Sequence, residues 1–389
     1  MVFIEKIPFF ALSLASSVIT ILSQHSGKAI ASLEVIPIVK RLLVASRALI
    51  FYLFKMLWPT DLAPLYQYPS KISLFTFDYM GSFLLLIGIT VLCMWSLKKQ
   101  MVFSAVWAYY IVTLLPVLGI IHVGPQAAAN RYTYLPSLGP ILLIGLGVSW
   151  LWEKADVKQK GLNIIRISII ITSISILSIL SILTIKQIDI WSDSIKLWSK
   201  ELELYNNFIA YFNRADAYLI RGNYNNAIKD IDMAIILNPK DELAYYNRGL
   251  AYERLGDYDK AMNNYNMAIN LNPRFEYAYN IRGILNYKIE NYEQAIQDFN
   301  KAIEINSRFS LAFNNRGVVY RTLGFYPQAI NDLTRSIELN PNYAISYQNR
   351  AKTYLLTGRY EEADKDFKTA ARLGDKQAQD YLQSKGMNW

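Results

Sequence analysis

Cysteine and histidine are almost absent from this chain of 389 residues, and acidic residues are scarce in its first half. The single cysteine, Cys93, cannot form an intrachain disulfide, so neither half is a disulfide-stabilised scaffold. The two histidines, His25 and His122, have no cysteine or acidic cluster beside them, which argues against a structural zinc site. We interpret both as polar residues at helix ends and predict no metal site and no resident cofactor.

The shortage of acidic residues places the net charge in one half of the chain. Residues 1–187 contain 15 lysines and arginines against 6 acidic residues, whereas the remainder contains 25 of each. The excess lies in short loops and between apolar runs, which is typical of membrane orientation, whereas a nucleic-acid-binding protein needs a basic face on a soluble domain. We therefore expect membrane lipid, and no nucleic acid, among the partners of this half.

Long apolar runs predict membrane-spanning helices in the first half. A lipid span needs about 17 to 25 mostly apolar residues. Runs of this kind occupy 7–24, 79–97, 102–121, 135–152 and 164–185. The run at 7–24 has no small-residue cleavage site after it, so we expect it to be retained rather than removed as a signal peptide.

A sixth segment, 36–58, is interrupted by four cations: Lys40, Arg41, Arg47 and Lys55. It is either an amphipathic surface helix or a span with its cations at the ends or in a polar interior. Cations in short loops mark the cytoplasmic side, which places Lys98, Lys99 and the loop after 152 inside. Alternation then puts the loops 59–78 and 122–134, and everything after Lys186, outside. This scheme favours a span at 36–58 and a total of six.

From Phe208 onward the chain repeats at an interval of 34 residues, which indicates a repeat array. The repeated positions include an arginine (Arg214, Arg248, Arg282, Arg316, Arg350) and, next to it, a small residue (Ala215, Gly249, Gly283, Gly317, Ala351). Small residues at this spacing are expected where two helices cross closely. The pattern resembles the tetratricopeptide repeat over Phe208 to about Lys376. Repeat three departs most, with Glu290 in place of the turn glycine.

These observations predict an all-α protein in which a transmembrane helix bundle precedes an α-solenoid. We expect a membrane domain of about six helices at 1–187, a connector with an incomplete repeat at 188–207, five repeats at 208–377 and a capping helix at 378–389. Stability in such an array is summed over neighbouring interfaces, so single departures from the pattern are tolerated.

An asparagine precedes the repeated arginine in four of the five repeats, at Asn213, Asn247, Asn315 and Asn349, while Ile281 breaks the row. An amide donates and accepts, so it can pair with any peptide backbone. Packed helices lie about 8 to 10 Å apart, close to three residues of an extended chain. The row therefore predicts binding of an extended polypeptide of varied sequence, which the topology above makes an exported one, and it resembles the asparagine ladder of O-linked N-acetylglucosamine transferases. The alternative is that these asparagines cap or bridge neighbouring helices.

Three motifs in the first half carry a further resemblance. They are EKIPFF (Glu5–Phe10), KMLWPTDLAPLYQYP (Lys55–Pro69) and PVLGIIHVGPQAAANRYTYLPSLG (Pro116–Gly139). Together with the repeats, they resemble the transmembrane and tetratricopeptide-repeat-containing O-mannosyltransferase family. The resemblance implies a partial GT-C-like glycosyltransferase bundle that uses a lipid-linked donor such as polyprenyl-phosphate mannose. It also implies an extracytoplasmic site, at a bacterial cell membrane or in the endoplasmic reticulum.

By this resemblance Arg131, Tyr132, Tyr134 and Lys55 lie beside the donor phosphate, where a guanidinium can pair with phosphate oxygens. The other interpretation of Arg131 is a solvated or headgroup-bound arginine. Asp61 belongs to the second motif, and Asn130 stands where the family usually has an acid.

The catalytic residue remains unknown, because the family's acidic loop precedes the segment that Glu5 to Phe10 matches. We therefore expect the carboxyl-terminal part of a transferase that is not autonomous. The competing hypothesis is a non-catalytic, membrane-anchored scaffold that recruits proteins through its repeats.

Overall fold

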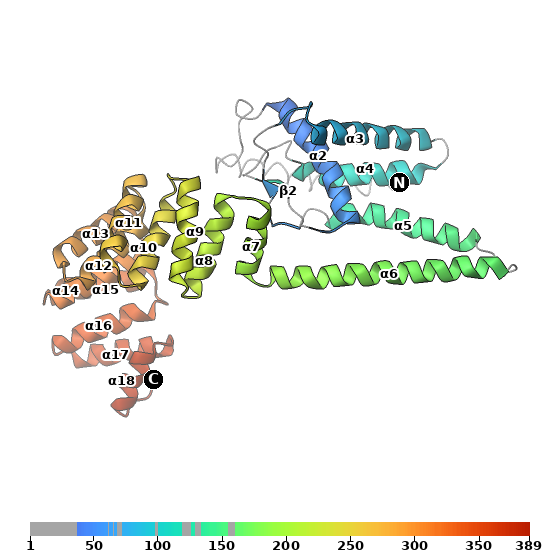
Figure 1. Cartoon of the computed structure of the whole chain (residues 1–389). Coiled ribbons are helices and arrows are strands. Elements are labelled where there is room, and N and C mark those ends of the chain that lie inside the picture. Colours follow the sequence, from blue (N-terminus) through green and yellow to red (C-terminus); the bar gives the residue numbers. More distant parts are fainter. Residues whose placement is uncertain are drawn as a thin grey trace, which may run out of the picture. The chain divides into compact units, whose positions relative to one another are not determined.

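The computed structural model describes residues 37–60, 62–64, 66–67, 72–97, 100–118, 126–128, 134–154 and 160–389. The chain forms two compact units, one that ends at Asn206 and one that begins at Asn207 (Figure 1). The predicted span at 7–24 lies outside the described residues, as do Asp61, Arg131 and Tyr132.

Helices dominate the described part of the first unit. They are α2 (Ile38–Leu57), α3 (Phe77–Ser96), α4 (Met101–Leu114), the short 3₁₀ helix η2 (Leu115–Val117), α5 (Tyr134–Lys154), α6 (Lys160–Trp191) and α7 (Ser194–Leu204). Consecutive helices pack against each other from α2 to α7, and α3 to α6 run side by side in Figure 1.

Three helices of this unit are long and apolar enough to cross a membrane: α3, α5 and the stretch Ile164–Trp191 of α6. Their apolar side chains point mostly outward, and none of the most apolar window of α6 is buried. Helices that are apolar all round need an apolar surrounding, which lipid provides. Predicted spans at 79–97, 135–152 and 164–185 thus coincide with helices that meet the requirements, while insertion itself remains a prediction.

The other two predicted spans in the described residues differ from the expectation. The run at 102–121 forms a helix of only 14 residues, α4, which gives way to η2 around Pro116. Proline lacks the amide hydrogen that an α-helix needs and disfavours the helical conformation of the residue before it. The run at 36–58 forms α2, which is not among the three helices apolar enough to span.

One face of α2 forms the centre of the first unit's core. Ala45, Ala48, Leu49 and Tyr52 are buried there together with residues of α4, and the Tyr110 hydroxyl donates to the Leu49 carbonyl at 2.6 Å. The spacing of three and four residues between these positions places them on one helical face.

Two short strands join loops that are far apart in sequence. β1 (Tyr66–Gln67) pairs antiparallel with β2 (Gln126–Ala128), with Tyr66 opposite Ala128. These strands differ from the all-α fold predicted from the sequence. This pairing brings the second and third motifs of the first half together.

The second unit is a stack of helix pairs that follow one another in chain order (Figure 1). The pairs are α8 (Phe208–Ile220) with α9 (Tyr224–Leu237), α10 (Glu242–Arg254) with α11 (Tyr258–Leu271), α12 (Glu276–Lys288) with α13 (Tyr292–Ile305), α14 (Ser310–Thr322) with α15 (Tyr326–Leu339), and α16 (Ala344–Leu356) with α17 (Tyr360–Arg372). A last helix, α18 (Lys376–Ser384), packs against α17. The solenoid predicted from the 34-residue interval is confirmed.

Small residues permit the close crossing within each pair, as the sequence predicted. A Cβ atom added to Gly249 would lie 2.5 Å from the Tyr265 ring, and one added to Gly283 would lie 2.8 Å from the Phe299 ring. Both distances are far below van der Waals contact, so a larger side chain here forces the two helices of the pair apart.

The turn between the two helices of a pair needs a left-handed residue. Gly256 and Gly324 adopt φ of 81° there, and Glu290 adopts φ of 62° at the same point of repeat three. Glu290 is the one non-glycine residue with positive φ in the described chain. This conformation costs about 1 to 2 kcal/mol for a residue with a Cβ, so repeat three retains the turn at the expense of strain.

Candidate polypeptide-binding surface

The five repeated arginines hold the solenoid together. Arg316 on α14 donates through Nε and Nη2 to both carboxylate oxygens of Asp332 at 2.7 Å, and through Nη1 to Asn300 Oδ1 at 2.5 Å. Asp332 lies on α15 and Asn300 on α13, so one guanidinium joins three helices. Arg282 and Arg350 do the same with partners 16 residues on either side: Asp298 and Asn266 for Arg282, and Asp366 and Thr334 for Arg350.

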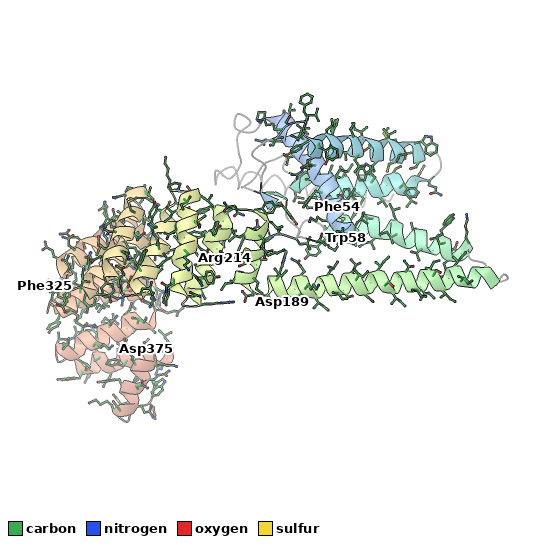
Figure 2. The ribbon with its side chains drawn as sticks, in the orientation of Figure 1. Phe54, Trp58, Asp189, Arg214, Phe325 and Asp375 are labelled. Atoms are coloured by element: carbon green, nitrogen blue, oxygen red, sulfur yellow. The ribbon has the colours of Figure 1, made fainter. Side chains whose placement is uncertain are left out.

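The arginine of repeat two also joins three helices, but its acidic partner lies in the preceding repeat instead of in its own second helix. Arg248 donates to Asn264 on its own second helix and forms its salt bridge with Asp232 of the preceding repeat. Arg214, labelled in Figure 2, pairs with Asp230 at 2.7 Å. Because these five side chains are engaged in joining helices, they are structural and offer little to a ligand. The acidic and amide residues that lie 16 positions before or after these arginines are the signal in the sequence that could have predicted this helix-joining role.

The helices α8, α10, α12, α14 and α16, the first helices of the five pairs, form one continuous surface. Three of the four successive pairs of first helices contact each other directly: α8 with α10, α12 with α14, and α14 with α16. The second helices contact mainly the first helix on either side. Helices that approach each other in a curved stack lie on its inner side, so this surface, called the inner surface below, is concave.

The predicted asparagine row lies on the inner surface, but its four members make different hydrogen bonds. Asn213 is partly exposed, and its amide donates to the Ile209 carbonyl of its own helix at 2.8 Å. Asn247 is also partly exposed. These two side chains face the surface without joining helices.

Asn315 and Asn349, by contrast, bridge neighbouring repeats. Asn315 Nδ2 donates to Asn280 Oδ1 and Asn349 Nδ2 donates to Asn314 Oδ1, both at 3.0 Å. Asn314 in turn donates to Asn315 Oδ1, which completes a chain of four amides through three repeats. The bridging alternative therefore describes these two residues, while a contact with peptide stays a prediction for all four.

The amides of Asn280 and Asn314 were not predicted from the sequence, although they share one repeat position with Gln348. Their partners lie 35 residues away, one more than the repeat interval. The two bonded residues occupy adjacent positions of the repeat, so the 34-residue period does not reveal the pair.

A buried acid lies on α10 near the inner surface. The Tyr265 hydroxyl donates to Glu253 Oε2 at 2.7 Å, and Lys288 of the next repeat forms a salt bridge with the same carboxylate. Burial is the main cause that raises the pKa of Tyr265, and the negative charge of Glu253 raises this pKa further. The Glu253 charge is thus compensated inside the array.

The residues predicted to lie near a donor phosphate are only partly described. Lys55, in the last turn of α2, donates from Nζ to the Thr60 carbonyl. Tyr134 is the exposed first residue of α5. Because Arg131 and Tyr132 lie outside the described residues, whether these four side chains meet stays a prediction. Within the described ranges, no three His, Cys, Asp or Glu residues lie together as a metal site would require.

Tetratricopeptide-repeat family models match much of this second unit. The matched stretches are residues 215–256, 243–275, 276–309, 311–343 and 333–365. These residues form tetratricopeptide repeats. The resemblance to this repeat inferred from the 34-residue interval is therefore confirmed, while the resemblance of the first half to O-mannosyltransferases stays a hypothesis.

Solved repeat structures are similar to the chain over less than half of its length. The crystal structure of MamA is 25% identical, with a TM-score of 0.38, and covers 42% of this chain and 96% of its own. PilF of Pseudomonas aeruginosa is 23% identical, with a TM-score of 0.41, covering 43% and 77%. YrrB, described as a TPR protein with an unusual peptide-binding site, is 21% identical, with a TM-score of 0.38, covering 48% and 97%. No protein of curated function matches the chain.

Proposed function

We propose that the repeat array binds extended polypeptide along its inner surface and that the apolar helices of the first unit hold the array at a membrane. The observation that carries the proposal is the contrast between the two polar rows on the first helices. The arginines are engaged in joining helices, whereas Asn213 and Asn247 remain partly exposed and join no helices. Amides in this position can pair with a peptide backbone whatever its side chains.

The proposal is tested by measuring how tightly the full chain in detergent binds an unstructured peptide of alanine, serine and threonine. We expect the double variant Asn213→Ala/Asn247→Ala to weaken binding about thirtyfold, because each of the two lost hydrogen bonds contributes about 1 kcal/mol and about 1.4 kcal/mol is a factor of ten. Asn263→Ala is the matched control, since Asn263 is exposed on the second helix α11. Equal affinity for the double variant and the control would contradict the proposal.

The exported location of the bound polypeptide is part of the same proposal. The surplus of cations in the loops predicted to be cytoplasmic supports an extracytoplasmic array. A reporter fused after Trp389 should be active only on the extracytoplasmic side. Activity restricted to the cytoplasm would mean that the array meets cytoplasmic polypeptides instead.

A second candidate function is participation in O-mannosyl transfer from a lipid-linked donor. The pairing of Tyr66–Gln67 with Gln126–Ala128 favours it, because it joins the two motifs that resemble the transferase family. In this candidate Arg131, Tyr132, Tyr134 and Lys55 bind the donor phosphate. Arg131→Ala should abolish binding of polyprenyl-phosphate mannose to the full chain while the peptide affinity stays unchanged. If Arg131→Ala does not alter donor binding, or if the wild type binds no donor, the transfer function is contradicted and only the scaffold function remains.

A further inference from the structure

Each of the five turns that connect the two helices of a repeat exposes a large apolar side chain. The exposed side chains are Ile220, Leu255, Ile289, Leu323 together with Phe325, and Leu356, with exposed fractions from 39% to 80%. Phe325, which Figure 2 labels, is half exposed. A single exposed apolar residue is ordinary on a soluble protein, but one at every turn forms a row along one edge of the array. This row is called the apolar edge below.

The residue pair at the start of each turn keeps its composition although its order changes. The pairs are Ile220–Arg221, Arg254–Leu255, Lys288–Ile289, Thr322–Leu323 and Leu356–Thr357. Every turn therefore presents one aliphatic residue beside an arginine, a lysine or a threonine. A strict copy of one repeat would keep each residue type at one position, so the feature that the five repeats share is the amphipathic character of this edge.

The fold of the turn does not require these aliphatic residues. In repeat two, backbone hydrogen bonds from Gly256 to the Glu253 carbonyl and from Asp257 to the Tyr252 carbonyl close the turn. An apolar contact that supports such a turn comes from the residue after the glycine, which is Asp257 here. Leu255 lies one residue before the glycine and is 45% exposed, so the turn leaves its side chain available to a partner.

The four turns between successive repeats form the opposite edge of the array and are polar. They occupy 238–241, 272–275, 306–309 and 340–343, and no large apolar side chain is exposed in them. Their exposed residues are prolines, asparagines, a serine and the cations Lys240, Arg274 and Arg308. The same helices lie behind both edges, so the contrast indicates an apolar environment at one edge only.

The chain itself places the array close to an apolar environment. Helix α6 contacts α7, and a salt bridge of 2.7 Å joins Lys196 on α7 to Asp189 on α6. Leu204 and Tyr205, at the end of α7, pack against the core of the first unit. Asn207 already caps α8 of the array. Because α7 is only about 16 Å long, a bilayer around the predicted span in α6 lies within reach of the array.

We propose that the apolar edge lies in the interfacial region of the membrane and holds the array against the bilayer. This inference rests on the proposed function, in which the first unit anchors the chain in a membrane. The aliphatic and aromatic side chains reach the acyl chains, while the arginines and lysines beside them extend to the headgroups. Leu255 lies eight residues beyond Asn247, or about 12 Å along α10, so the contact leaves the inner surface open to polypeptide.

Charge contributes little to this contact because both signs occur at the turns. The exposed cations Arg254 and Lys288 are accompanied by the exposed acids Asp259 and Glu290. The attraction is instead the burial of apolar surface, which salt does not screen. The contact should therefore form with zwitterionic lipid and persist at about 1 M salt, in contrast to the binding of a basic patch to anionic lipid.

The experiment places a fluorescent probe at either edge of repeat three in the full chain. Cys93→Ser removes the single native thiol. Asn291→Cys then provides an exposed labelling site on the apolar edge, and Ser307→Cys provides one on the opposite edge. The labelled chain is inserted into phosphatidylcholine vesicles whose acyl chains carry bromine near the headgroup as a quencher. We expect quenching at position 291 and almost none at 307, with no change at about 1 M salt.

Leu255→Ser/Leu323→Ser removes an aliphatic residue from the turns on either side of the probe at 291. The ratio of docked to undocked array should fall about twenty-five-fold, because the loss of each partly inserted leucine changes this ratio about fivefold. The matched control is Leu237→Ser/Leu243→Ser, two leucines that flank a turn of the opposite edge. They are 40% and 44% exposed, against 45% and 39% for the first pair, and their loss should leave the quenching unchanged.

The outcomes separate this inference from the proposed function. Equal quenching at both positions, or none at 291 in a chain that resists carbonate extraction from the vesicles, overturns the inference and leaves the membrane anchor intact. A chain that carbonate extracts contradicts the anchor and the inference together. Energy transfer between probes at 291 on different copies, without quenching by lipid, means that a second copy covers the apolar edge, which also overturns the inference.

Discussion

The two units of this chain place apolar and polar side chains in opposite ways. In the first unit, α3, α5 and α6 expose most of their leucine, isoleucine and phenylalanine side chains. In the second, rows of alanines such as Ala227, Ala261 and Ala295 are fully buried, and arginines join the helices. The difference is what two different surroundings require, and it supports the proposal that the first unit lies in lipid and the second in water.

The largest expected effect concerns the arginines of the second unit. Arg282→Ala leaves Asp298 with an uncompensated charge, and the side chain of Asp298 is only 7% exposed. We expect a loss of about 3 to 5 kcal/mol in the free energy of unfolding. Urea unfolding of the full chain, followed by the helical circular dichroism signal, measures it.

Arg248→Ala serves as the comparison, because its acidic partner Asp232 is 47% exposed and its second partner, Asn264, is neutral. A loss of about 1 kcal/mol is expected there. Equal losses for both variants would mean that burial of the acid does not set the value of these contacts.

The second largest effect is expected from a lysine placed in an exposed apolar position of each unit. Ile176 on α6 and Ile236 on α9 are both more than half exposed. Ile176→Lys should disfavour membrane insertion of α6 by about 3 kcal/mol, and a reporter after Trp389 would then appear partly on the wrong side. Ile236→Lys should leave the reporter unchanged. If Ile176→Lys were also silent, α6 would not lie in lipid.

The smallest effect concerns the strained turn of repeat three. Glu290→Gly removes the strain of a left-handed residue and should raise the free energy of unfolding by about 1 kcal/mol. Gly324→Ala, at the same point of repeat four with φ of 81°, should lower it by a similar amount. Thermal unfolding of both variants measures the two shifts, and shifts of the same sign would refute a purely conformational cause.

The sequence predicted most of the second unit because its signals are local and repeated. The predicted start at Phe208 is the first residue of α8, and the glycines at 249 and 283 lie where helices cross. In the first half, apolar length alone predicted a helix that continues to residue 121, but α4 ends before Pro116. The helix α6 continues to Trp191 because no proline or glycine interrupts 162–191.

The candidate site was only partly predictable. The asparagine row was predicted from its period, but the bonds of Asn315 and Asn349 join residues 35 positions apart and so fall outside that period. The pairing of β1 with β2 depends on tertiary structure and involves too few residues for a strand signal.

Site-specific photo-crosslinking tests the central claim most directly. A photoreactive amino acid at position 247 on α10 and one at position 263 on α11 sample the inner surface and the second helix of the same repeat. With an unstructured peptide bound to the full chain, the account predicts crosslinks from position 247 and none from 263. Crosslinks from 263 alone, or equally from both positions, would contradict binding on the inner surface.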